Sequence, residues 1–216
     1  MSEKKKVIVE LFLDENNQDD SLDLISFVSE PAIEKDFVFY NKEKETIKFK
    51  ATNEDKRLVT GPVLVPNQEI LRLDAQGNPW FAVMSEETIL QARELFAKYG
   101  QQQATNYQHE TKLRDVTVVE SWIVTDPNND KSNALGFTDI PEGTWFVTYK
   151  VDNDELWSAV KTGKALGFSI EGMFSRRVLE MSSEVKEDIL YDEIQKVLND
   201  SELSDDVKFD KLKKIL

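Results

Sequence analysis

Cysteine is absent from the 216-residue chain and histidine occurs once, and both scarcities limit its chemistry. Without cysteine there is no disulfide scaffold, no thiol nucleophile and no cysteine-ligated zinc or iron-sulfur site, which suits a reducing compartment. One histidine cannot build a multi-histidine zinc site, and any imidazole base must be His109. We therefore expect neither a metal nor a cofactor.

Long apolar runs and concentrated positive charge are also missing. The longest apolar stretch, near residues 116–124, is interrupted by charge well before the roughly 20 residues of a membrane span. The first residues alternate apolar and acidic side chains, unlike a signal peptide. A net charge of -14, with short basic runs only at residues 4–6 and 211–214, disfavours nucleic-acid binding. These features predict a soluble cytosolic protein with neither membrane nor nucleic-acid partners.

Short apolar segments bounded by turn residues predict a mainly β body. A hairpin over residues 71–84 is expected to turn at residues 76–78. The segment 58–65 is interrupted by Gly61-Pro62, and the segment that begins at residue 166 is expected to continue to residue 179. The remaining expected strands are residues 7–13, 24–28, 37–40, 46–51, 116–124 and 143–151.

Two short helices interrupt this pattern. Ser85 can cap a helix that places Ile89, Ala92, Phe96 and Tyr99 on one face and ends at Gly100. A second helix is expected after a cap at Asp154. Residues 101–106 are interpreted as a polar linker, and residues 126–133 as a loop.

Helical spacing returns after residue 181, so the sequence predicts a body over residues 1–181 and a helical C-terminal tail over residues 182–216. Three roles are open for this tail. It packs against the body, docks on a partner such as a scaffold or shell, or is removed by self-cleavage.

Ser169 stands between two glycines in Gly167-Phe-Ser-Ile-Glu-Gly. The spacing is one residue longer than the nucleophile elbow of α/β-hydrolases, and strand residues rather than a helix follow, so that fold is rejected. The glycines either let a substrate backbone approach the hydroxyl or mark bulges in a curved strand. His109 by itself also leaves two interpretations, a catalytic base or a structural hydrogen-bonding residue.

Taken together, the sequence resembles the phage prohead proteases, specifically the XkdF-like group, which is related to the prohead proteases of HK97 type and to herpesvirus assemblin. The resemblance covers about residues 20–175, and it depends on the order and spacing of several blocks. These are Ser26-Phe-Val-Ser-Glu-Pro-Ala-Ile-Glu-Lys-Asp-Phe, Gly61-Pro-Val-Leu-Val-Pro-Asn, Ile70-Leu-Arg-Leu-Asp, Tyr107-Gln-His-Glu, Val118-Val-Glu-Ser-Trp-Ile-Val, Pro141-Glu-Gly-Thr-Trp, and Leu156-Trp through Gly167-Phe-Ser-Ile-Glu-Gly.

The resemblance implies a fold and an activity. The fold would be α+β and mainly β, an assemblin-like closed or nearly closed β-barrel with flanking helices. The activity would be that of a serine endopeptidase with His109 as general base and Ser169 as nucleophile. Its substrates would be scaffold protein, capsid protein and the protease itself, and self-association is left open. It would act inside the phage procapsid in the host cytoplasm. Its gene would belong to a phage or to a prophage in a bacterium.

The third catalytic residue departs from the family pattern. The family's acid is expected on a strand that ends in Val-x-x-Pro-Ala, and here that pattern lies near the N-terminus, where Leu24 occupies the matching position and the neighbouring Asp23 faces the other way. Glu120, set in an apolar run, is our first alternative, although a solvent-facing charge explains it equally well. The resemblance also suggests Arg176 and Arg177 as oxyanion-stabilising groups.

Two other classes of protein compete with the enzyme. A noncatalytic capsid-assembly or scaffold-associated protein could keep the protease body without activity, and the missing acid favours it. A β-barrel that binds a small ligand would leave His109 and Ser169 far apart or buried in the barrel wall.

Overall fold

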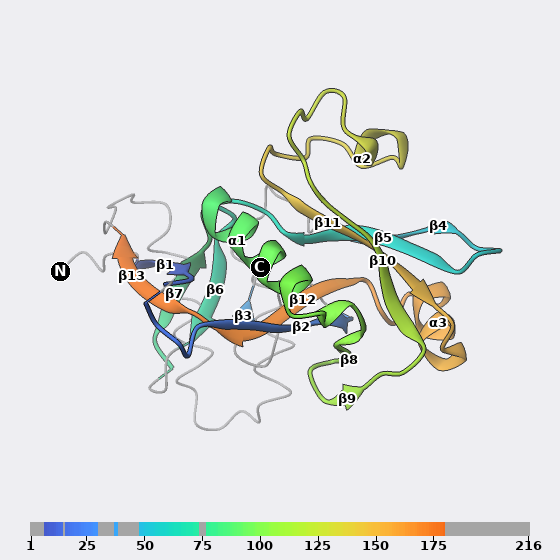
Figure 1. The fold of residues 1–216 in the computed structure, drawn as a ribbon, viewed down its shortest axis with the longest axis horizontal. Helices are drawn as coiled ribbons and strands as arrows, with labels where there is room; N and C mark the ends of the chain where they lie inside the picture. Colours follow the sequence, from blue (N-terminus) through green and yellow to red (C-terminus); the bar gives the residue numbers. More distant parts are fainter. Residues whose placement is uncertain (1–6, 15, 30–36, 39–47, 74–76, 180–216) are drawn as a thin grey trace, which may run out of the picture.

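The computed structural model describes residues 7–14, 16–29, 37–38, 48–73 and 77–179 (Figure 1). Their strands form three sheets of five, four and four strands, with a few short helices between them. The predicted mainly β class is therefore confirmed. No closed barrel is found among these strands, so the barrel part of the prediction is not confirmed. The tail over residues 182–216 lies outside the described residues, and its boundary with the body stays a prediction.

Sheet 1 joins the two ends of the described chain. Its strands, in order, are β13 (Ser175–Leu179), β1 (Ile8–Phe12), β7 (Pro79–Val83), β6 (Ile70–Leu73) and β3 (Phe37–Val38). β6 and β7 pair antiparallel and confirm the predicted hairpin. β1 pairs parallel with β7 and antiparallel with β13, so strands at opposite ends of the sequence become neighbours.

Sheet 2 is antiparallel and contains a deeply buried strand. Its order is β10 (Val116–Ile123), β11 (Trp145–Val151), β5 (Leu58–Leu64) and β4 (Lys50–Asn53). Six of the seven residues of β11 are buried, as expected for a strand covered on both faces. β5 continues through Gly61-Pro62, where the sequence suggested an interruption.

Sheet 3 consists of β12 (Gly167–Met173), β2 (Ser21–Val28), β8 (Thr105–Tyr107) and β9 (Thr111–Lys112), in that order. The expectation of one strand from residue 166 to residue 179 is wrong. β12 ends at Met173 in sheet 3, and the chain then enters sheet 1 as β13. β8 also corrects the sequence analysis, since residues 105 and 106 were assigned to a polar linker.

The helices largely follow the capping signals of the sequence. α1 (Glu86–Lys98) begins after Ser85, whose hydroxyl accepts a hydrogen bond from the Thr88 amide, but Tyr99 is 64% exposed and does not share the buried face. α3 (Asp154–Lys161) is capped by Asn153 rather than by Asp154. The loop after β10 contains a short helix, α2 (Lys131–Ala134), and a 3-10 turn, η1 (Gln101–Gln103), follows α1.

Four aromatic rings join sheets 2 and 3 in the core. Phe168 of β12 lies 5.1 Å from Phe27 of β2 and 5.4 Å from Tyr149 of β11, measured between ring centroids. Phe49 packs edge-on against Phe27 at 5.8 Å. Edge-to-face pairs at such distances are favourable beyond the area that they bury. This cluster fixes which face of β2 and of β12 points inward.

Within the described ranges, no helix is long and apolar enough to cross a membrane.

Gly61 is required by the close approach of Phe49, and its replacement tests the contact between β5 and the aromatic cluster. A Cβ atom at residue 61 would lie 2.5 Å from the Cβ and 2.7 Å from the Cα of Phe49. Because backbone atoms would have to move, Gly61→Ala is expected to lower the free energy of unfolding by about 1–3 kcal/mol. Urea unfolding measures this change. The exposed Ser158→Ala on α3 is the control, with an expected change within about 0.5 kcal/mol, and an equal effect of the two variants would contradict the contact.

Candidate active site

Sheet 3 places three polar residues in one row across neighbouring strands. Ser169 of β12 is paired with Ser26 of β2, and Ser26 is paired with Asn106 of β8. Paired residues of adjacent strands project on the same face of a sheet. Ser169, Ser26 and Asn106 therefore share a face.

That face is opposite to the aromatic core. In β2, Phe27 follows Ser26, and in β12, Phe168 precedes Ser169; both phenylalanines are buried in the core. Because side chains alternate along a strand, both serines project from the opposite face of the sheet. Glu171 lies two residues after Ser169 and returns to the same face. Ser26 is completely buried, whereas Ser169 is partly exposed.

His109 reaches this face from the tight turn between β8 and β9. Gln108 and His109 both have left-handed backbones, with φ of 56° and 59°, and the amide of Glu110 donates to the carbonyl of Tyr107 at 3.2 Å. Two consecutive left-handed residues define a turn that usually selects glycine or asparagine. Each such residue other than glycine costs about 1–3 kcal/mol, and strain of this kind gathers at functional sites.

His109 and Glu171 form the central contact of the site. The Nδ1 atom of His109 lies 2.7 Å from Oε1 of Glu171 and 3.0 Å from Oγ of Ser26. An ionised carboxylate can only accept hydrogen bonds, so Nδ1 carries the proton in this pair. Nε2 is then the nitrogen available as a base. The imidazole side chain is 18% exposed and the Glu171 side chain 34%.

The structure thus sets both residues of the predicted catalytic pair on one face of sheet 3. Ser26, the cross-strand neighbour of Ser169, touches the imidazole of His109, and Glu171, two residues beyond Ser169, touches it as well. An imidazole held by a carboxylate, on a sheet face that also carries a partly exposed serine, provides the kinds of group that serine hydrolases use.

Glu120, our first alternative for the acid, lies in sheet 2 and has other partners. Its Oε2 accepts a hydrogen bond from the Thr148 hydroxyl at 2.8 Å and lies 2.5 Å from Nζ of Lys131. The Lys131 ammonium and the Thr148 hydroxyl lower the pKa of the Glu120 carboxyl. These contacts describe a half-exposed ion pair, so the catalytic assignment of Glu120 gains no support from them.

Arg176 and Arg177 lie in sheet 1, beyond the end of β12. Arg177 donates to the Glu10 carboxylate from Nε at 3.0 Å and from Nη2 at 2.5 Å, and the Arg176 guanidinium lies 5.4 Å from the centre of the Trp80 ring. At about 3.3 Å per residue, the seven residues from Ser169 to Arg176 span about 23 Å of extended chain. Their role at the oxyanion stays a prediction that these partners do not support.

The second glycine of the serine motif has a structural explanation. The pairing of β12 with β2 shifts between Glu171 and Gly172, which marks a β-bulge. A Cβ atom at Gly172 would overlap the carbonyl oxygen of Ser21. Of the two interpretations open for this glycine, the bulge is the one that the structure bears out.

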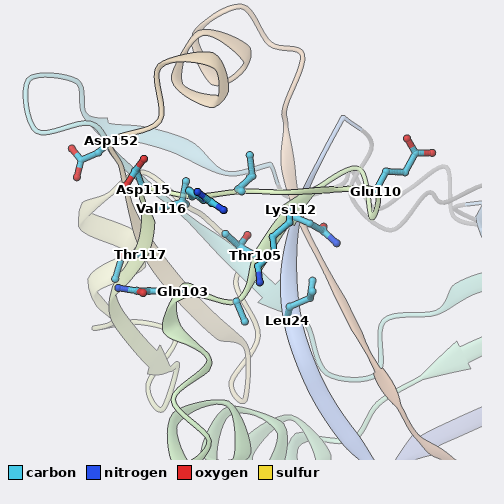
Figure 2. Close-up of a pocket in the computed structure, with 13 residues that line it drawn as sticks. Leu24, Gln103, Thr105, Glu110, Lys112, Asp115, Val116, Thr117 and Asp152 are labelled. Carbon is cyan, nitrogen blue, oxygen red and sulfur yellow. The ribbon is translucent and has the colours of Figure 1, made fainter.

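A pocket of about 890 Å³ borders the site on the side of the carboxylate. Leu24 and Asn106 form its wall toward Glu171, and Figure 2 shows Leu24 at one end and Asp115 and Asp152 at the other. The pocket lies over β2, β8 and the start of β10, whereas Ser169 is on β12 at the other edge of sheet 3. It therefore lies behind the acid rather than beside the nucleophile.

Sequence reasoning missed Glu171, Asn106 and Ser26. A signal existed for Glu171, because the period of two along a strand places it on the face of Ser169. Ser26 and Asn106 gave no comparable signal, since their role depends on the pairing of β2 with strands from distant parts of the sequence.

Comparison with protein families gives one match. The family model described as "Putative phage serine protease XkdF" matches residues 45–177, which is more than half of the chain and contains Asn106, His109, Ser169 and Glu171. The chain belongs to this family, as the resemblance in its sequence indicated. Searches of curated proteins and of solved structures gave no match.

If the Glu120 ion pair stabilises the fold, the stability of a Glu120→Gln variant will respond differently to pH. The pKa of Glu120 is lowered in the folded protein, so its contribution is present at neutral pH and is lost as the pH falls below the ordinary value of 4.5. We expect native protein to be slightly more stable than the variant at pH 7, because the pair is half exposed and screened. The difference should shrink as the pH falls from 4.5 through the lowered pKa of Glu120. Urea unfolding across this range measures it, and a difference independent of pH would contradict the assignment.

Proposed function

We propose that this protein is a serine endopeptidase that matures phage procapsids, with Ser169 as nucleophile, His109 as general base and Glu171 as the acid that orients the imidazole. The observation that carries the proposal is the 2.7 Å contact between His109 Nδ1 and Glu171 Oε1 on the face that Ser169 shares. Membership of a family described as a phage serine protease supports it.

Two observations assign Ser169 rather than Ser26 as the nucleophile. They are the solvent exposure of each serine and the His109 nitrogen to which each could pass its proton. Ser26 is completely buried, so a peptide carbonyl cannot reach it. Ser26 also touches Nδ1, the nitrogen that already faces Glu171. A base must accept the serine proton on its unprotonated nitrogen, which is Nε2 here, and the partly exposed Ser169 is the hydroxyl that substrate can approach.

In this proposal, Glu171 takes the role of the acid that the family pattern leads us to expect at Leu24. Leu24 of β2 and Glu171 of β12 are direct cross-strand partners. Side chains at such positions have Cβ atoms about 5 Å apart. A carboxylate that starts from β12 can therefore reach nearly the same place as one that starts from β2. This placement supports Glu171 as the acid whose absence had favoured a noncatalytic protein.

The chemistry follows from these roles. The Ser169 hydroxyl attacks a peptide carbonyl while its proton passes to Nε2 of His109, and the resulting imidazolium is stabilised by the Glu171 carboxylate at Nδ1. The imidazolium then gives its proton to the leaving amine, and an acyl-enzyme forms on Ser169. Water, activated by the same imidazole, releases the product. Backbone amides are the expected donors to the oxyanion.

The substrates proposed are the scaffold and capsid proteins and the protease itself. Enclosure in a procapsid raises the local concentration of such substrates, so weak binding suffices for cleavage. We place the protein there, within the host cytoplasm.

Co-expression with the scaffold and major capsid proteins of the same phage tests the proposal. Ser169→Ala and His109→Ala should abolish processing, and Glu171→Gln should slow it by about 10⁴-fold, since each removes a member of the triad. Gels and intact-mass spectrometry measure the products. Glu120→Gln is the matched control and should process normally.

Identical products from native protein and Ser169→Ala would overturn the enzyme assignment and support a noncatalytic capsid-assembly protein. Loss of processing in Glu120→Gln, with normal processing in Glu171→Gln, would return the acid to sheet 2.

A further inference from the structure

Three hydrogen-bond donors converge on one oxygen of Glu171. Besides His109, the Nδ2 atom of Asn106 donates to Oε1 at 2.7 Å, and the Ser26 hydroxyl donates to it at 3.3 Å. Each donor comes from a different part of sheet 3: β8, β2 and the turn after β8. A carboxylate oxygen held from three directions has little freedom to move away from the imidazole.

Both additional donors are buried, and the pocket that Asn106 borders lies behind the acid rather than beside Ser169. Ser26 is completely buried and Asn106 is 7% exposed. Their contacts at the site are with Glu171 and, for Ser26, with Nδ1 of His109. Any effect of these two residues on the reaction must therefore pass through the carboxylate and the imidazole.

The orientation of Asn106 is determined by the carboxylate. If its amide were turned over, Oδ1 would face Oε1 of Glu171 and two acceptors would oppose each other. In the observed orientation, Oδ1 is buried without a hydrogen-bond partner among the residues that the structure describes. A half-satisfied buried amide is costly to stability, and such costs are typical of functional sites. The amide of Asn106 thus donates to Glu171 while its own Oδ1 atom lacks a hydrogen bond from the described residues.

Ser26 contacts both His109 and Glu171. Its Oγ lies 3.0 Å from Nδ1 of His109 while its proton points to Glu171. Rotation of the imidazole away from Glu171 would break both the contact with the carboxylate and that with Ser26. The hydroxyl therefore favours the ring orientation in which Nδ1 faces Glu171.

We propose that Asn106 and Ser26 are positioning residues, which hold the Glu171 carboxylate against Nδ1 of His109 and so fix the tautomer of the catalytic base. The expected effect on kcat rests on the proposed function. The expected effect on the His109 tautomer does not. The protonated nitrogen of a histidine is set by the hydrogen bonds around its ring, whether or not the protein cleaves a substrate.

The single histidine of the chain makes this testable by nitrogen NMR on full-length protein labelled in its imidazole. Native protein should show Nδ1 protonated and Nε2 unprotonated. Asn106→Leu, which removes the donor at similar volume, and Ser26→Ala should each shift the ring toward a mixture of tautomers. Asn106→Asp, which sets a second carboxylate against Glu171, should shift it as well. Ser132→Ala, an equally buried serine of α2, is the control and should leave the spectrum native.

Cleavage of purified scaffold protein at several concentrations provides the second measurement. Because misplaced catalytic groups slow the chemical step, kcat should fall about 10- to 100-fold in Asn106→Leu and in Ser26→Ala, with KM close to native. Ser132→Ala should keep both constants. Thermal unfolding of each variant separates this loss from a loss of folded protein.

Native tautomers and a native kcat in both Asn106→Leu and Ser26→Ala would overturn the positioning role and leave the triad intact. Unchanged scaffold processing in Ser169→Ala would instead defeat the proposed function, while a tautomer shift in the same two variants would still support the hydrogen-bond network.

Discussion

The register of β12 against β2 is the constraint on which the candidate site depends. Phe168 and Phe27 are cross-strand partners, and both are locked in the aromatic core. Since side chains alternate along a strand, a slip of one residue would turn Ser169 into that core and Phe168 out of it. The free energy of packing the aromatic rings therefore also determines where the serine and the glutamate stand. In this sense the core of the protein and its chemistry are specified by the same strand pair.

His109 is positioned by a different means. A residue within a strand projects its side chain to one face of its own strand. The His109 imidazole, however, contacts Ser26 of β2 and Glu171 of β12. The left-handed residues Gln108 and His109 fold the chain back to achieve this. The turn is anchored where the Gln108 amide donates to the Phe27 carbonyl at 2.9 Å and where Oε1 of Gln108 accepts from the Ser29 amide at 3.3 Å. Strain in the turn is thus balanced by contacts to β2, the strand that carries Ser26.

Local patterns predicted the local structure well, because their causes are local. The hairpin of β6 and β7, the Ser85 cap of α1 and most strands follow from alternation, turns and capping. The arrangement of three sheets could not be predicted in the same way. It depends on two parallel pairings, β1 with β7 and β2 with β8, which join segments about 70–80 residues apart in the sequence. The site shows the same division. His109 and Ser169 stand out by residue type and motif, whereas Asn106, in a segment interpreted as a linker, gains its place only through its pairing with β2.

In the proposed triad, the acid is Glu171 of β12, whereas the family pattern sets it on β2. The imidazole responds to the position of a carboxylate oxygen relative to Nδ1, and not to the strand from which that carboxylate starts. Glu171 and Leu24 face each other across β12 and β2, so one site on the sheet surface can be filled from either strand. Filling it from β12 places the acid two residues from the serine, where both depend on one register. β2 supplies Ser26, which lies outside the span matched by the family model although it touches both the His109 imidazole and the Glu171 carboxylate. The support of the site thus extends beyond the part of the chain by which the family is defined.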